Sequence, residues 1–485
     1  MKILNKVLPI GEDLGGVVLK VRNPRDGKYD YEFKTKSADE IKQKCTDLRQ
    51  AQKHWYASGV ACRVAILQKW KASLLAHNDL IINALTHDTG RKSESILEAN
   101  LMQSSIDRWC GISQEFFTEN RQKVASIPFI NIQQDEVPYS LVGVISPWNF
   151  PLLLATIDTI PALLAGCAVI VKPSEITPRF IEIIQKTIDE VPELAKVLTF
   201  VAGAGETGGD ILQNVDLVCF TGSVATGRKI YHAAAERFIP CFLELGGKDA
   251  ALVFEGADLD LATSSILWGS VVNCGHSCLS IERVYVQKNI FEEFVAKIVA
   301  KAEQVKLAYP TLSDGQIGPV ISEKQVAIID EHLRDALEKG AKLLVGGSKC
   351  EELGGGFWCK PTILTNVSAD MKVMTEETFG PIIPIMPFET ETEALAFANG
   401  TIFGLSGAVF AKTVDEALRI GQQMEAGAIS INDCALTAVV HEGEKNSFKM
   451  SGIGGTRMGK SAIKRFMRQR AFLIKNQEIR SPWWF

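Results

Sequence analysis

The chain has 485 residues, of which 46% are hydrophobic and 22% charged, and its formal net charge is −5. This length exceeds what a single hydrophobic core ordinarily supports, and the composition excludes a disordered or fibrous chain. Because lysine and arginine are scattered and the charge balance is acidic, we expect no nucleic-acid partner.

The sequence shows no sign of export or of a membrane span. The opening residues, MKILNKVLPIGEDLGG, lack the apolar core and cleavage site of a secretory signal. Asp158 and Pro161 interrupt the apolar stretch 151–171, which we interpret as a buried helix and strand. The eleven cysteines are irregularly spaced and no pair has zinc-finger spacing, which favours reduced thiols and no metal site. We expect a soluble, cytoplasmic protein with no membrane partner.

Helices dominate the first third of the chain. Ser37 and Glu40 have the spacing of a capping box, and apolar residues then recur with a helical period. The same period predicts further helices over 60–77, 79–87 and 93–117, followed by extended segments at 124–132 and 136–145.

From residue 141 onward, short β-rich runs alternate with helices. The predicted strands are LVGVI, AVIVKP, VLTFV and DLVCFTG, and two of the intervening helices lie near 152–165 and 177–190. Continuously apolar runs such as 168–171 and 217–220 are typical of buried parallel strands. The pattern therefore predicts a doubly wound parallel sheet.

A second alternating series begins after about residue 250. It comprises the strand RVYV, helices over 289–306 and 323–339, the strand KLLVG, and a last unit of 406–411, 413–426 and AISIN. Gly340 is expected to end the second of these helices. This half of the chain is predicted to be a separate α/β domain.

One glycine motif has the context of a dinucleotide-binding turn. Gly203, Gly205 and Gly208 spell G-x-G-x-x-G between a predicted strand and a predicted helix. The acid expected about 20 residues later is absent, since Gly222 and Ser223 occupy that region. A tight turn without a ligand explains the motif equally well.

A better candidate for a ribose-binding acid lies upstream of these glycines. Lys172 and Glu175 follow the strand AVIV at the expected carboxyl edge of the sheet, where open α/β sheets bind ligands. A carboxylate that accepts from ribose hydroxyls would repel a 2′-phosphate, so Glu175 favours NAD over NADP. A solvated loop is the alternative.

Cys278 is a candidate nucleophile. It lies in NCGHSCLSIERVYV, just ahead of a strand and among small or polar residues, which suits an exposed thiol. Reactivity requires a lowered pKa, which no local feature establishes, so a structural role stays open. Cys274 is the nearest rival.

A base and an oxyanion donor are suggested by two further motifs. Glu244 in FLELGGK precedes two glycines that allow close backbone approach, which suits a carboxylate directed into a cleft. Asn149 is held between Pro147 and Pro151, so its amide is a candidate donor to an oxyanion. A surface glutamate and a turn asparagine are the ordinary alternatives.

Taken in order, the motifs ISPWNFP, VKPSE, FTGS, ELGGK, Cys278, EETFGP and SGIGG resemble those of the aldehyde dehydrogenase superfamily, of the NAD(P)-dependent hydrolytic, non-CoA-acylating type. The resemblance runs from about residue 37 to the C-terminus. It implies an α/β protein with a Rossmann-like doubly wound cofactor domain, a second α/β catalytic domain and a small β oligomerisation element. The implied bounds of the cofactor domain are 1–118 with 139–246, and those of the catalytic domain are 247–446. The implied oligomerisation element comprises 119–138 and 467–485.

The resemblance implies a reaction and the residues that perform it. Cys278 is the implied nucleophile, Glu244 the base, and Asn149 with the Cys278 N–H the oxyanion hole. An aldehyde is oxidised with NAD through a cysteine thiohemiacetal and a thioester, which Glu244-activated water hydrolyses. The implied cofactor contacts are Trp148, Lys172, Glu175, Gly205, Ser223, Glu377 and Phe379. The implied substrate contacts are Phe150, Leu154, Ser277 and Leu279.

Two departures from the family pattern lie near the expected substrate entrance. His276 stands where the family usually has Gln, and HEGEKNSFKMSG replaces the commoner PFGG-type loop. For His276, an acid–base role and a packing role are both open. The apolar channel favours an uncharged aldehyde, whereas charged residues of this loop, Lys445 among them, suit a polar or semialdehyde substrate at the mouth.

Two rival functions are weighed against this prediction. In a CoA-acylating semialdehyde dehydrogenase a thiol replaces water, and Glu244 argues against that reaction. A non-catalytic protein that retains the fold is the other rival, and the intact candidate triad argues against it.

The C-terminal segment RAFLIKN resembles the family's strand that joins a neighbouring subunit, so a homodimer or homotetramer is expected. The final SPWWF either covers that interface or packs on the chain's own surface.

Overall fold

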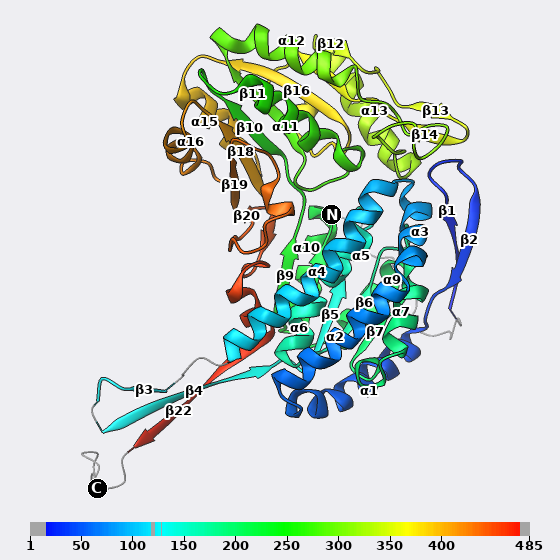
Figure 1. The fold of residues 1–485 in the computed structure, drawn as a ribbon, viewed down its shortest axis with the longest axis vertical. Helices are drawn as coiled ribbons and strands as arrows, with labels where there is room; N and C mark the ends of the chain where they lie inside the picture. The colour runs from blue at the N-terminus through cyan, green and yellow to red at the C-terminus, as the bar shows by residue number, and fades with distance from the viewer. Residues whose placement is uncertain (1–15, 118–121, 128, 476–485) are drawn as a thin grey trace, which may run out of the picture.

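The computed structural model describes residues 16–117, 122–127 and 129–475, and its fold is drawn in Figure 1. A hairpin of β1 (Val18–Arg22) and β2 (Tyr29–Lys34) precedes four helices: α1 (Ala38–Ala57), α2 (Val60–Ala76), α3 (Asn78–Thr89) and α4 (Lys92–Phe117). The predicted capping box is present, because Ser37 Oγ accepts from Glu40 N–H and the Glu40 carboxylate accepts from Ser37 N–H. The helical period of the sequence therefore located this segment correctly.

The first large sheet has six strands in the order β21-β9-β8-β5-β6-β7. Its strands are β5 (Leu141–Ile145), β6 (Ala168–Lys172), β7 (Leu198–Phe200), β8 (Leu217–Thr221), β9 (Cys241–Glu244) and the antiparallel β21 (Gly452–Ile453). After β5 the chain adds β6 and β7 on one side and β8 and β9 on the other, so the strand order reverses beside β5. A doubly wound sheet binds ligands at the carboxyl end of this switch point.

The helices of this unit are α5 (Pro151–Thr156), α6 (Thr159–Ala165), α7 (Phe180–Asp189), α8 (Pro192–Ala195), α9 (Gly205–Leu212) and α10 (Val224–Glu236). The single helix predicted near 152–165 is wrong, because α5 and α6 are separate. Pro161 has no N–H to donate to the preceding turn, and its ring clashes with a continuing helix. The break leaves the buried Asp158 carboxylate to accept from Arg457 and Arg465.

The second large sheet has seven strands in the order β12-β15-β16-β11-β10-β18-β19, all parallel except β12. Its strands are β10 (Asp249–Val253), β11 (Ile281–Gln287), β12 (Lys342–Val345), β15 (Thr362–Thr365), β16 (Ile382–Phe388), β18 (Ser406–Phe410) and β19 (Ala428–Ile431). Its helices are α11 (Leu259–Val271), α12 (Phe291–Ala302), α13 (Glu323–Glu338), α14 (Lys372–Thr375), α15 (Glu391–Asn399) and α16 (Val414–Gly421). Each large sheet is embedded in its own cluster of buried apolar residues.

Short elements complete the second half of the chain. They are the hairpin β13 (Glu351–Leu353) with β14 (Gly356–Trp358), the pair β17 (Phe403–Gly404) with β20 (Phe448–Lys449), and the 3₁₀ turns η1 (Val272–Gly275), η2 (Lys288–Ile290), η3 (Leu436–Ala438) and η4 (Lys460–Phe466). Among the described residues, no helix is long and apolar enough to cross a membrane.

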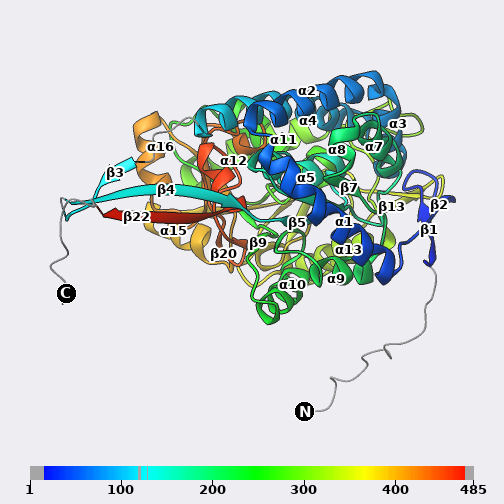
Figure 2. The ribbon, with the colours of Figure 1, turned by 90° about the horizontal axis from the view of Figure 1, so that it is seen from below.

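A ribbon of three antiparallel strands projects from the body of the molecule in both views (Figures 1 and 2). It consists of β22 (Met467–Lys475), β4 (Ile130–Pro138) and β3 (Gln122–Val124), with β4 in the middle. β22 pairs with β4 from Met467 to Lys475. The extended segment predicted at 124–132 is interrupted between β3 and β4. SPWWF at 481–485 lies outside the described residues.

Candidate active site

A cleft of about 530 Å³ is lined by residues from both halves of the chain. Residues at or after the carboxyl ends of β5, β6, β8 and β9 in the six-stranded sheet line one side of it, as expected for a switch point. From the second half it receives Cys278, Glu377, Phe379 and part of the segment 322–328. The ten residues predicted for catalysis and cofactor binding all line it: Cys278, Glu244, Asn149, Trp148, Lys172, Glu175, Gly205, Ser223, Glu377 and Phe379.

Cys278 lies between η1 and β11 and is half-buried at the cleft wall. All eleven cysteines are free thiols, and nine of them are buried, including the rival Cys274. Cys62 is exposed, but it lies on α2 and is not among the residues that line the cleft. Burial raises the pKa of the Cys278 thiol to about 12, and the positive charge of Lys445 opposes that rise. The resting thiol is therefore protonated, and attack requires loss of this proton.

The backbone near Cys278 is strained. Asn273, Cys274 and Phe379 have φ values of 59°, 58° and 52°, in the left-handed region that side chains other than glycine rarely occupy. The Asn273 amide donates to the carbonyls of Asn149 and His276, both at 3.0 Å. Such conformations cost about 1–3 kcal/mol each and are often retained at functional sites.

Asn149 follows β5 and is a buried residue, only 4% exposed. Its Nδ2 donates to the His276 carbonyl at 3.1 Å, two residues before Cys278. An amide nitrogen carries two N–H groups, so this bond uses one of them. The hydrogen bond fixes the amide plane close to the segment that carries Cys278.

Glu244 is the last residue of β9, and the two glycines that follow allow a close backbone approach. A Cβ added at Gly247 would lie 2.4 Å from the Cys278 carbonyl oxygen, and one at Gly246 would lie 2.4 Å from a Glu377 oxygen. Burial raises the pKa of Glu244, but the charges of Lys445 and Arg457 and other nearby donors outweigh burial, so the net pKa is lowered. Glu244 is therefore a carboxylate at neutral pH.

The residues predicted to contact the cofactor form two groups in the cleft. Lys172 Nζ lies 3.3 Å from Glu175 Oε2 at the carboxyl end of β6. Ser223 is the N-cap of α10 and accepts from Thr226 N–H. At the other end, Glu377 Oε1 accepts from Gly247 N–H at 3.0 Å, and burial raises the pKa of Glu377 to about 8.

His276 packs with two aromatic side chains of the cleft. Its ring stacks on Phe379 with 5.7 Å between centroids, and Trp148 contacts it edge-on at 5.0 Å. Ile321 N–H donates to Nε2, so Nδ1 carries the hydrogen that is donated to the Phe379 carbonyl. Burial lowers the pKa of His276 well below its ordinary value. The neutral ring thus supports Phe379 and leaves neither nitrogen free for acid–base work.

The predicted substrate contacts divide between residues inside and outside this cleft. Leu154 lines it, whereas Phe150, Ser277 and Leu279 are not among the described residues that line it. The prediction missed four residues of the segment before and within α13 that do line the cleft: Ser322, Lys324, Gln325 and Ile328. No local motif marks them, because only the packing of the second domain brings them to the cofactor sheet.

A thiol, a carboxylate and an amide therefore share one cleft at the switch point of a doubly wound sheet, an arrangement typical of enzymes that bind a nucleotide. The model of the aldehyde dehydrogenase family matches residues 13–472. The chain belongs to the aldehyde dehydrogenase family and is an oxidoreductase that acts on aldehydes.

Several relatives share most of their length with this chain. The chloroplastic betaine aldehyde dehydrogenase of Beta vulgaris is 31% identical, covering 96% of this chain and 95% of its own. The NADP-dependent succinate-semialdehyde dehydrogenase of Escherichia coli is 32% identical, and the match covers 90% of this chain and 91% of that enzyme. The solved structure of an Anabaena variabilis protein assigned to the aldehyde dehydrogenases, PutA, is 57% identical with a TM-score of 0.95, covering 97% of this chain and all of its own. A betaine aldehyde dehydrogenase of Staphylococcus aureus solved with NAD+ is 28% identical, with a TM-score of 0.89 over 97% and 96%.

Proposed function

We propose that this protein oxidises an aldehyde to the carboxylic acid with NAD and releases the product by hydrolysis. The observation that carries the proposal is that Cys278, Glu244 and Asn149 line one cleft together with the ribose-binding candidate Glu175. A panel of aldehydes assayed with NAD and with NADP tests it. Formation of NADH and free acid supports the proposal, and acyl-CoA formation without free acid would contradict the hydrolytic step.

The proposed mechanism divides the oxidation between three side chains. The Cys278 thiol first releases its proton to solvent, and the thiolate adds to the aldehyde carbon. The Asn149 amide and the Cys278 N–H donate to the developing oxyanion of the thiohemiacetal. NAD, when bound, supplies the hydride acceptor, and loss of hydride converts the thiohemiacetal to a thioester. Glu244 then takes a proton from water, hydroxide adds to the thioester, and the acid leaves as the thiol is restored.

The cleft suits a dinucleotide in shape and chemistry. A Cβ added at Gly205, the first residue of α9, would meet no atom within 4 Å, so the backbone faces open space there. Lys172 and Glu175 present a donor and an acceptor to ribose hydroxyls. Glu377, Trp148 and the backbone beside Phe379 would hold the nicotinamide half.

Glu175 is proposed to select NAD over NADP, and replacing it tests this role. We expect Glu175→Gln to raise the kcat/KM ratio of NADP to NAD by about tenfold, since one repulsive charge is removed from the 2′-phosphate position. Steady-state kinetics with both cofactors on one aldehyde measure the ratio. Glu236→Gln is the matched control, because Glu236 is exposed on α10 and is not among the residues that line the cleft. An unchanged ratio in Glu175→Gln would contradict the selection role.

In this proposal the domain bounds follow the two large sheets except for β21, which joins the first sheet from outside them, and the projecting ribbon is the oligomerisation element. β22 is an edge strand, and its side chains Phe472, Leu473 and Ile474 are 44%, 71% and 47% exposed. Unpaired edge strands with exposed apolar residues are ready to pair with another chain. A homodimer or homotetramer in the cytoplasm is the proposed state.

Leu473→Asp tests the proposed interface. The carboxylate would be buried on assembly, so we expect light scattering after gel filtration to report a smaller particle than for wild type. Phe238→Asp is the control, because Phe238 is 99% exposed in the turn after α10, away from the ribbon. The interface role fails if Leu473→Asp leaves the mass unchanged.

A further inference from the structure

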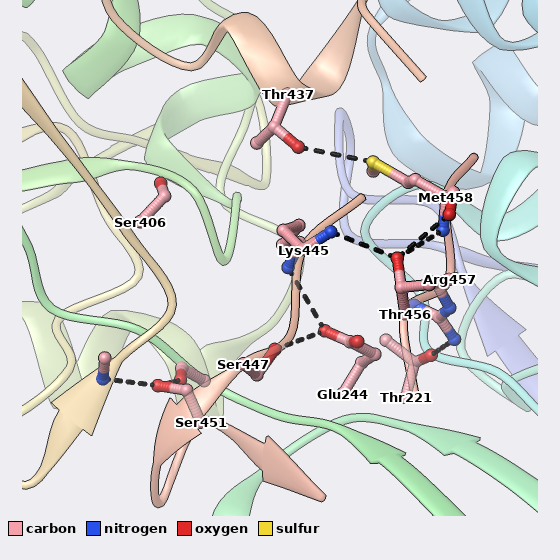
Figure 3. Close-up of polar contacts among 12 residues, drawn as sticks. Thr221, Glu244, Ser406, Thr437, Lys445, Ser447, Ser451, Thr456, Arg457 and Met458 are labelled. Atoms are coloured by element: carbon pink, nitrogen blue, oxygen red, sulfur yellow. Dashed lines mark hydrogen bonds and ion pairs between the residues drawn. The ribbon is translucent and has the colours of Figure 1, made fainter. Parts of the chain in front are cut away.

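The loop that departs from the PFGG-type sequence contacts the proposed base directly. Lys445 Nζ lies 3.5 Å from Glu244 Oε2, and Ser447 Oγ donates to the same oxygen at 2.7 Å. Figure 3 shows both side chains converging on the Glu244 carboxylate. Lys445 was expected at the mouth of the substrate channel. Instead its side chain is only 8% exposed and contacts Glu244, the proposed general base.

The backbone of this loop is held in place on both sides of the contact. Lys445 N–H donates to Thr456 Oγ1 at 3.1 Å, and Ser451 Oγ donates to the Gly246 carbonyl at 2.7 Å. β21 then pairs with β9, so Gly452 lies opposite Glu244 itself. The contact between Lys445 and the base is therefore built into the fold.

Lys445 is the cation in direct contact with Glu244. Arg457 and Arg465 also face the carboxylate, but both already bind the buried Asp158. The side chain of Glu244 is 12% exposed, and a buried charge is costly unless it is paired. Without the ammonium, the hydrogen bond from Ser447 would be the remaining direct polar contact of this carboxylate among the described residues.

We propose that Lys445 is a positioning residue that keeps Glu244 ionised and oriented in the cleft, ready to take a proton from water during thioester hydrolysis. This inference rests on the proposed role of Glu244. Since a base must be deprotonated to act, loss of the ammonium leaves the effect of burial less opposed and shifts the acidic limb of hydrolysis to higher pH. At high pH Glu244 is ionised even without the ammonium, so the rate of hydrolysis in a variant that lacks Lys445 approaches that of wild type.

Hydrolysis of the acyl-enzyme isolates this effect. Lys445 also lies near the Cys278 thiol, as do Asp249 and Glu377. Once Cys278 carries an acyl group its sulfur no longer titrates, so the rate at which the acyl group is lost reports on the base and not on the nucleophile. The ester p-nitrophenyl acetate acylates a reactive thiol without any cofactor, and mass spectrometry follows the decay of the acetyl-enzyme.

The experiment compares this decay in wild type and Lys445→Met across pH. We expect the acidic limb of the decay profile to move up by about one pH unit, so that the loss reaches about tenfold at pH values below the wild-type limb, while the rate at pH 9 stays within about twofold of wild type. Lys445→Gln is expected to show the same shift and serves if the methionine variant does not fold, whereas Lys445→Arg restores the wild-type profile. Lys449→Met is the matched control, because Lys449 is in the same loop but pairs with Glu425 at 2.7 Å.

A double-mutant cycle decides whether Lys445 acts through the base. In a Glu244→Gln background, Lys445→Met should change the decay rate by less than about twofold, since there is no carboxylate to ionise. The proposal would be overturned if Lys445→Met lowered the decay rate equally at every pH, or equally in both backgrounds. It would also be overturned if the variant only raised the KM of aldehydes that bear a carboxylate. If Glu244→Gln alone decays as fast as wild type, the proposed role of Glu244 fails instead.

Discussion

Replacing Cys278 with alanine is expected to lower kcat/KM for aldehyde oxidation by about 10⁴-fold or more, because no covalent intermediate can then form. The variant should still fold, since the half-buried side chain of Cys278 loses a single sulfur atom at the cleft wall. NADH formation measures the loss, and circular dichroism verifies the fold. No acyl-enzyme should be detected by mass spectrometry.

Two other thiols supply the controls for this variant. Cys62→Ala removes the exposed thiol of α2, and Cys274→Ala removes the buried thiol nearest in sequence. Both variants should keep their activity within a few-fold of wild type. Full activity in Cys278→Ala, or a loss in Cys62→Ala of the same size, would remove Cys278 from the role of nucleophile.

Replacing Glu244 with glutamine is expected to convert steady turnover into a burst. Oxidation does not require the base once the thiolate has added, so about one NADH per site should form before the thioester accumulates. The following steady rate should fall by about 10²–10⁴-fold, the range for loss of a general base. Rapid-mixing kinetics measure the burst, and mass spectrometry identifies the acyl-enzyme.

Glu255→Gln is the control for the glutamine substitution, because Glu255 is exposed just after β10. It should show neither burst nor loss of rate. If Glu244→Gln loses the burst as well as the steady rate, Glu244 acts before hydride leaves, and the assignment to thioester hydrolysis is wrong.

Local patterns accounted for most of the elements. The capping box at Ser37 marked the start of α1, and Gly340, with φ of 96°, follows the end of α13 as expected. These signals are local, because a cap or a left-handed glycine needs only neighbours within a turn. The break between α5 and α6 was missed although Pro161 was noted, since an apolar period continues across it.

Long-range pairing was beyond reach of these patterns. β21 is a strand of two residues that pairs with β9, although it lies about 200 residues further along the chain. Strand propensity cannot predict so short a segment. Its place on the edge of the cofactor sheet brings the departing loop onto Glu244. The sequence identified that loop as unusual without indicating what it contacts.

The sequence by itself indicated the two α/β halves, the candidate nucleophile and base, and the candidate ribose-binding acid, since each rests on a local pattern or an ordered set of motifs. Only the tertiary structure decided what His276 and Lys445 contact. A histidine is a base or a packing residue according to the partners of its two nitrogens, and Ile321 and Phe379 occupy both. A lysine is a surface charge or a partner of a buried carboxylate according to burial, and Lys445 reaches Glu244 only because folding joins two distant segments.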